Sequence, residues 1–175
     1  MLRKKEDKNI ALGKGVFKVD GTPIGLTRDG GSFIVEREYR LQHADGDRGA
    51  VKGRIRIEKS IAKLTINHLE VLTEFFKLHP GLNEDKESVT GSTVVTGTGR
   101  ISLTDYHLVE WDGETNDGRE LKIELEDAIN LENINWDLKD KDDIIDKVTY
   151  EATYDDAKDT DDSEKFKITY KNIVA

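Results

Sequence analysis

The chain has 175 residues, which suits one domain built around a single core. Its 27 Lys and Arg against 36 Asp and Glu give a formal net charge of −9, and it contains no cysteine. The missing cysteine excludes a disulfide framework, a thiolate zinc site and a cysteine nucleophile. The acidity argues against general binding to nucleic acid or to anionic membranes.

The N-terminal residues 1–9 are charged and do not have the pattern of a signal peptide. No apolar run approaches the roughly 18–20 residues that a membrane helix needs. We therefore expect a protein that is made and kept in a cytoplasm unless a dedicated assembly exports it. Residues 1–13 predict a flexible N-terminal arm, and residues 14–175 predict one β domain.

Alternating apolar and charged residues predict strands in the first half of the domain. Residues 33–41 alternate cleanly, with Glu36 and Glu38 on the charged face. The glycine-rich residues 43–49 precede a second alternating strand, and residues 62–66 predict a further one. In the second strand the side chains divide into two faces, apolar Val51, Ile55 and Ile57 and charged Lys52, Arg54, Arg56 and Glu58.

Residues 67–78 predict the one helix of the chain. Asn67 can cap its N-terminus, and Glu70, three residues later, has the spacing of a capping box. Pro80 and Gly81 end the pattern. The apolar stripe expected to pack this helix on the sheet consists of Leu69, Leu72, Phe75 and Phe76.

The second half combines short apolar strands with charged connections. Residues 82–92 predict a charged loop, and residues 137–143 and 155–164 predict solvated connectors. The segments predicted as strands are 94–95, 107–111, 121–126, 148–154 and 166–170. Many short strands with one helix predict a mainly β fold, an antiparallel β-sandwich or barrel with one flanking α-helix at about residues 67–78.

No residue pattern selects an enzyme. The four histidines lack metal-ligand spacing, and no serine lies in the Gly-x-Ser-x-Gly turn of a hydrolase. Residues 97–100 lack the ending of a phosphate-binding loop and predict a hairpin turn instead. The acidic clusters at Asp45 with Asp47 and at residues 155–162 lack the spacing of a calcium loop. We expect no catalytic residue, no metal and no cofactor.

Three segments follow one another in the first half of the chain and precede the predicted helix. They are Gly21–Glu36, Ala44–Gly53 and Lys63–Ile66. This order, over residues 14–79, resembles the major tail tube proteins of long-tailed bacteriophages, an architecture shared with contractile injection and type VI secretion tubes. The resemblance implies that six copies form a ring and that rings stack into a tube that conducts DNA without binding it specifically. It also implies loops and terminal arms as contacts between rings, other tail proteins as partners (initiator or baseplate, tape measure, terminator), no membrane, and a place in the virion tail after assembly in the host bacterial cytoplasm.

Three groups of residues are candidates for this assembly. The candidate inter-subunit loop comprises His43, Asp45, Gly46, Asp47, Arg48 and Gly49. The candidate interface strand is basic and comprises Lys52, Arg54 and Arg56, which we expect to meet an acidic neighbouring subunit. The candidate acidic lining of the lumen comprises Glu36, Glu38, Glu120, Glu124 and Glu126, unless these are ordinary solvated strand faces.

Two other functions are open at this level. One is a monomeric β-barrel or sandwich that binds a ligand or another protein, and the other is an unrecognised carboxylate enzyme. Edge strands distinguish the monomer from the tube subunit, because a monomer protects its edges and a tube subunit pairs them with a neighbour.

Overall fold

The structure is a computed structural model that describes residues 10–71, 79–87, 91–155 and 164–171. Within these residues the chain is mainly β, which confirms the predicted class. Its elements are β1 (Ala11–Val19), β2 (Thr22–Pro23), β3 (Thr27–Leu41), β4 (Ile55–His68), β5 (Leu82–Glu87), β6 (Ser92–Gly97), the 3-10 turn η3 (Leu103–Asp105), β7 (His107–Thr115), β8 (Glu120–Asn130), β9 (Asp146–Ala152) and β10 (Phe166–Tyr170).

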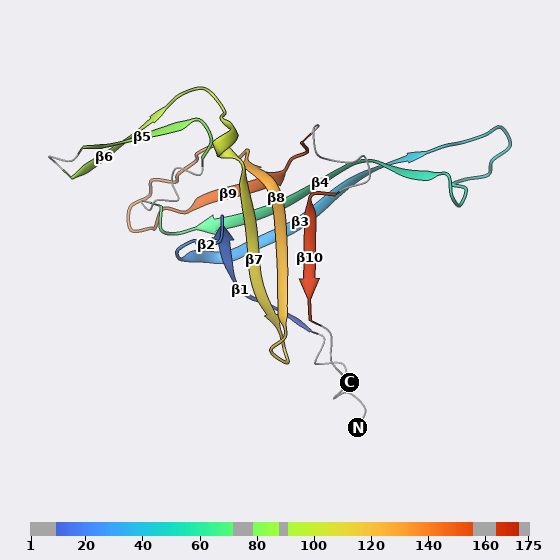
Figure 1. Cartoon of the computed structure of the whole chain (residues 1–175), viewed down its shortest axis with the longest axis horizontal. Helices are drawn as coiled ribbons and strands as arrows, with labels where there is room; N and C mark the ends of the chain where they lie inside the picture. The colour runs from blue at the N-terminus through green and yellow to red at the C-terminus, as the bar shows by residue number, and fades with distance from the viewer. Residues whose placement is uncertain (1–9, 72–78, 88–90, 156–163, 172–175) are drawn as a thin grey trace.

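Eight strands form one antiparallel sheet in the order β2-β1-β7-β8-β9-β4-β3, with β10 added to β8. Strands β7, β8 and β10 cross in front of β3, β4 and β9 (Figure 1). The order begins at β2 and ends at β3, which do not pair, so the described strands do not close into a barrel. The fold is therefore sandwich-like, with one sheet that turns back over itself.

Strand β8 is where the sheet changes direction. Its first half pairs with β10 from Leu121 to Leu125, and its last three residues pair with β9. The pairing with β7 slips between these halves, and Asp127 there has a positive φ of 48°. Such a bulge bends a strand and raises its twist, which lets β8 belong to both layers.

The core lies between the two layers. Phe33 of β3 and Phe166 of β10 face each other with ring centroids 5.7 Å apart, although their strands do not pair. Strands β1, β4, β7, β8 and β9 contribute the buried side chains of one hydrophobic cluster. Its members are Phe17, Val19, Ala62, Leu64, Ile66, Val109, Leu125, Ala128, Val148, Tyr150 and Ala152. In β1, β4 and β9 they alternate with exposed or half-buried polar residues, as expected where one face of a strand is solvated.

The predicted start of the helix is wrong. Asn67 and His68 end strand β4, where they pair with Lys147 and Asp146 of β9. The long-range pairing satisfies the backbone groups that a helix cap would otherwise use. Leu69 is half-buried after the strand, and no flanking helix lies in the described residues. The rest of the predicted packing stripe, Leu72, Phe75 and Phe76, lies outside them.

Two other boundaries also differ from the sequence prediction. The predicted N-terminal arm overlaps β1, which begins at Ala11, and its residues 1–9 lie outside the described part. Residues 82–87 are not a loop, because they pair with residues 92–97 as the separate hairpin β5–β6. This hairpin lies at the end of the molecule opposite to the tip of the β3–β4 hairpin (Figure 1).

Gly31 provides a test of the close approach between the layers. A Cβ at this position would lie 2.1 Å from the Thr65 carbonyl oxygen and 2.8 Å from Cζ of Phe17. We expect Gly31→Ala to lower the free energy of unfolding by about 1–3 kcal/mol, since backbone and a core ring must both shift. Gly13→Ala in β1 is the matched control, because nothing lies within 4 Å of its Cβ position. Urea unfolding of both variants measures the difference, and equal midpoints would contradict the predicted approach.

Candidate assembly surface on the β3–β4 hairpin

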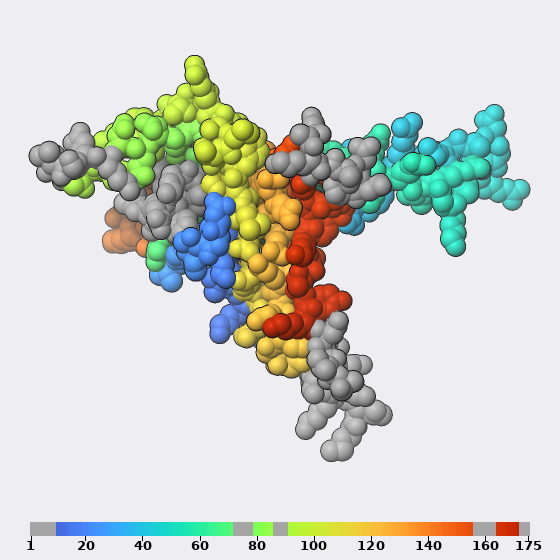
Figure 2. Space-filling model, in the orientation of Figure 1, coloured from blue at the N-terminus to red at the C-terminus, as the bar shows by residue number. Residues whose placement is uncertain are grey.

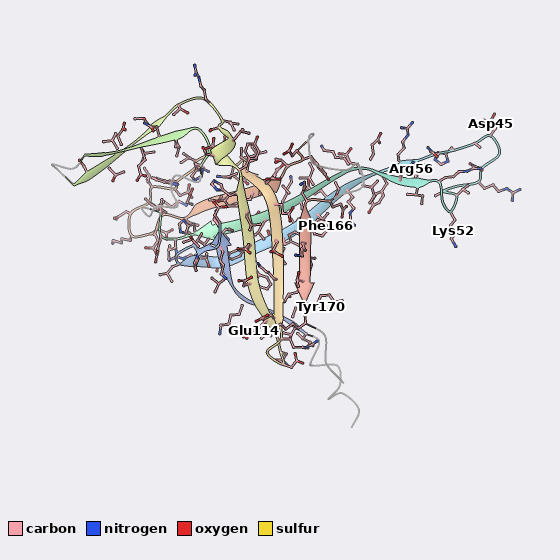
Figure 3. The ribbon with its side chains drawn as sticks, viewed as in Figure 1. Asp45, Lys52, Arg56, Glu114, Phe166 and Tyr170 are labelled. Carbon is pink, nitrogen blue, oxygen red and sulfur yellow. The ribbon has the colours of Figure 1, made fainter. Side chains whose placement is uncertain are left out.

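The outer part of the β3–β4 hairpin projects away from the sheet. Strand β9 pairs with β4 only from Lys63 to His68, whereas β3 and β4 pair with each other out to Leu41 and Ile55. We call residues 39–59 the β3–β4 extension. It stands clear of the body of the molecule (Figures 1 and 2), and Asp45, Lys52 and Arg56 lie along its length (Figure 3). No other described strand pairs with this segment.

One face of the β3–β4 extension is apolar and open to solvent. Tyr39 lies opposite Ile57, and Leu41 lies opposite Ile55. Their exposed fractions are 57%, 51%, 45% and 49% respectively. Residues opposite each other on neighbouring strands share a face, so the four side chains form one contiguous strip. Apolar side chains gathered in this way on a protein surface are typical of an interaction site.

A β-bulge keeps this strip on the same side as the core. Glu38 pairs with Lys59 and Tyr39 pairs with Ile57, which leaves Glu58 as an extra residue in β4. The apolar residues of β4 fall at odd positions before the bulge and at even positions after it. Since one extra residue reverses the side on which later side chains lie, the bulge aligns Ile57 with Ala62 and Leu64. The exposed strip is therefore a continuation of the core face.

The base of the β3–β4 extension is fixed by a carboxylate that precedes β10. Glu164 accepts two hydrogen bonds from the Arg37 guanidinium, both of 2.7 Å, and one of 2.7 Å from the Ser60 hydroxyl. The hydrogen bond from Arg37 holds the pKa of Glu164 below its usual value. A bidentate pair adds geometric restraint as well as energy, so it fixes the direction in which the hairpin leaves the sheet.

The predicted inter-subunit loop lies at the tip of the β3–β4 extension. Asp47 shapes it, because its Oδ2 accepts hydrogen bonds from the Ala44 N–H at 2.7 Å and the Arg54 guanidinium at 2.9 Å. Gly46 has a positive φ of 93°, which favours glycine. The other predicted loop residues, His43, Asp45, Arg48 and Gly49, belong to the same tip between β3 and β4. The predicted loop is thus a single structural unit.

The predicted basic strand is only partly a strand. Lys52 and Arg54 precede β4, which begins at Ile55, and only Arg56 is within it. Arg56 lies directly opposite Arg40 of β3, and both are exposed. Arg40, Arg56 and Lys52 make no ion pair with any described residue. Like charges directly opposite each other destabilise a strand pair, so this arrangement has a local cost.

The predicted acidic lining is divided between two strands that do not pair. Glu36 and Glu38 are on β3, and Glu120, Glu124 and Glu126 are on β8. Lysines neutralise most of them. The ion pairs are Glu36–Lys63 at 3.1 Å, Glu38–Lys59 at 3.9 Å, Glu120–Lys171 at 2.7 Å, and Glu124 with Lys122 at 2.9 Å and Lys167 at 3.6 Å.

A buried polar cluster that the sequence did not reveal joins the end of β8, the start of β9 and the segment that precedes β5. The amide of Asn130 donates to Nδ1 of His79 at 2.9 Å, so Nε2 of His79 carries the proton and donates to Asp146 at 2.6 Å. Trp136 Nε1 donates to the other oxygen of Asp146 at 3.1 Å. Burial raises the pKa of Asp146, but the bonds from His79 and Trp136 outweigh burial and leave this pKa below its usual value.

Stability should fall in mild acid because of His68, which is buried beside this cluster. Burial lowers the pKa of His68 below 6.5. The negative charges of Asp146 and Glu70 act in the opposite direction and raise this pKa, and His79 lowers it further. The unfolded chain then binds a proton below about pH 6.5 that the folded chain does not, so acid favours unfolding by up to about 1.4 kcal/mol per pH unit.

Urea unfolding between pH 7 and pH 5 measures this slope. Protonation of Asp146 does not contribute to the slope between pH 7 and pH 5. Because its pKa is lowered in the folded chain, this carboxylate affects the free energy of unfolding only below about pH 4. His68→Gln should flatten the pH dependence, whereas His43→Gln at the exposed tip should leave it unchanged. An unchanged slope in His68→Gln would assign the pH dependence to another group.

The described residues contain no group of three His, Asp or Glu side chains placed to hold a metal ion. Nor does any helix in that part of the chain have the length and apolar character to span a membrane. The sequence matches no protein-family model and no curated protein.

Proposed function

We propose that this chain is a structural subunit that assembles with copies of itself. The observation that carries this proposal is the apolar strip of Tyr39, Leu41, Ile55 and Ile57. The strip continues the core face, yet no part of its own chain among the described residues covers it. Burying one such side chain contributes about 1.5–3 kcal/mol, so a second copy that covers the strip gains enough to associate.

The edge strand β3 supports the same proposal. It has fifteen residues, and among the described strands it pairs with β4 alone. Monomeric proteins shorten or cover such edges, because a long row of free backbone N–H and C=O groups is a template for another strand. A subunit whose edges pair with neighbours has no need of this protection. This favours assembly over the alternative of a monomeric binding module.

The form of assembly that we propose is a hexameric ring, with rings stacked into a phage tail tube that conducts DNA. The sandwich-like fold and the projecting hairpin are compatible with the tail-tube resemblance of residues 14–79. Six chains of −9 each give a ring a formal charge of −54, which suits a conduit that DNA crosses without binding. Other tail proteins that begin and end the tube are the remaining partners of this proposal.

Light scattering and negative-stain electron microscopy of the purified chain, over a range of concentrations, test this function. We expect rings or tubes whose share grows with concentration. Shortening the tip over residues 43–50 should reduce stacking while circular dichroism stays that of the wild type. A chain that stays monomeric at millimolar concentration would contradict the proposal and favour the monomeric binding module.

A further inference from the structure

The two ends of the long strand β3 differ in charge. The β3–β4 extension carries six basic and three acidic side chains, a net charge of +3 in a chain of net charge −9. Residues 131–145, which we call the connector, join β8 to β9 and carry five acidic and two basic side chains, a net charge of −3. Arg28 near the start of β3 pairs with Asp142 at 3.7 Å and contacts Asp143, which places the connector at that end.

The distance between these charged regions follows from strand geometry. Arg28 and Leu41 are thirteen residues apart on one strand, and at about 3.3 Å per residue they are separated by about 40 Å. Figure 1 shows the connector at the end of the molecule away from the β3–β4 extension. One subunit therefore cannot neutralise its own extension with its own connector.

Both regions also expose apolar side chains. On the β3–β4 extension they are the apolar strip of Tyr39, Leu41, Ile55 and Ile57. In the connector, Leu131, Ile134 and Leu138 are 55%, 45% and 79% exposed. Asp140 lies two residues beyond Leu138, is exposed and makes no ion pair with a described residue. Each region thus combines an apolar surface with charge, and the charges are of opposite sign.

We propose that the β3–β4 extension of one copy docks on the connector of a second copy, head to tail. This inference rests on the proposed function and names the surface that receives the hairpin. The facing pair Arg40 and Arg56 is the strongest argument. Its repulsion costs stability in the free subunit and is relieved when an acidic surface of the next copy lies against it. Because the contact joins two different surfaces, each copy keeps one of each free and the assembly propagates.

Charge reversal tests this contact. The variant R40E/R56E has an acidic extension and an acidic connector, and D137K/D140K has a basic extension and a basic connector. Each alone should associate about 100-fold more weakly than the wild type by light scattering. An equimolar mixture should recover assembly, since each variant then meets its complement. A single chain with all four changes should recover it as well.

Cross-linking locates the contact directly, because the chain has no cysteine of its own. A mixture of K52C and L138C chains should give an intermolecular product with a short bismaleimide, and neither variant alone should give it. A wild type that assembles without this product, or charge variants that fail to complement, would overturn the head-to-tail contact while leaving self-assembly intact. A wild type that never assembles would overturn both proposals.

The same experiments separate this contact from binding to an anionic surface. A basic and apolar segment can also bind an anionic membrane. A flotation assay with phosphatidylserine vesicles therefore compares the wild type with R40E/R56E. No retention of the wild type is expected, because the net charge of −9 opposes the approach. Retention that depends on Arg40 and Arg56, with no cross-linked product, would assign the extension to a membrane surface and overturn the proposal.

Discussion

Replacing Ile55 and Ile57 with threonine should abolish self-association while leaving the subunit folded. Both side chains are about half exposed in the free chain, so the fold loses little burial. Threonine keeps the β-branched shape that suits a strand. At an interface, each substitution removes about 1.5–3 kcal/mol of apolar burial, and the pair together weakens association at least about 100-fold. Sedimentation velocity over a concentration series measures the loss.

Ile34→Thr is the matched control for this experiment. Ile34 is in the same hairpin and is 49% exposed, like Ile55, but it alternates with Phe33 and Val35 and so lies on the opposite face. Its replacement should leave association within about threefold of the wild type. If Ile34→Thr and Ile55→Thr/Ile57→Thr weaken assembly equally, the loss comes from general hydrophobicity and the strip is not the interface.

Asp146→Ala should destabilise the fold strongly. It removes the carboxylate that accepts from the Nε2–H of the buried His79 and from the Nε1–H of the half-buried Trp136. Loss of the acceptor of a buried donor costs about 1–3 kcal/mol, so the change at His79 alone costs this amount and the change at the half-buried Trp136 adds a smaller one. Single domains are stable by only about 5–15 kcal/mol, so urea unfolding should show a clear shift of the midpoint.

Asp142→Ala separates this effect from the loss of a carboxylate in general. Asp142 is exposed and pairs with Arg28 at 3.7 Å on the surface. Surface ion pairs of this kind contribute at most about 1 kcal/mol, so the midpoint should stay close to that of the wild type. If Asp146→Ala costs less than about 1 kcal/mol, the buried polar cluster does not hold the end of β8 and the start of β9 together.

The sequence predicts the strands best where alternation continues without interruption. Residues 33–41 and 121–126 fall within β3 and β8, and Phe33, Val35, Ile123 and Leu125 pack in or against the core. The pattern was less informative at Glu58, where the apolar positions change from odd to even. Two separate strands were expected there, yet β4 is one strand of fourteen residues with a bulge. A bulge looks like a break because alternation alone cannot distinguish an inserted residue from a turn.

Contacts between distant segments explain the other differences. The capping-box spacing of Asn67 and Glu70 is a real local preference, but pairing with β9 prevails over it at Asn67 and His68. His79 and Asp146 are 67 residues apart, so no spacing rule could have joined them. The acidic side chains of β3 and β8 suggest a negatively charged surface when the sequence is considered alone. The structure places lysines of neighbouring strands beside them, as in the pairs Glu36–Lys63 and Glu124–Lys167.

The projecting hairpin also has a consequence for how such a chain can change over generations. Residues 39–59 are not part of the described core, and the hydrogen bonds that form the cluster around Asp146 do not reach them. Substitutions at the tip can therefore alter the choice of partner without a penalty in folding, and substitutions around Asp146 can alter folding without altering that choice. Selection can act on the two properties separately, which lets new partner specificities arise on an unchanged subunit.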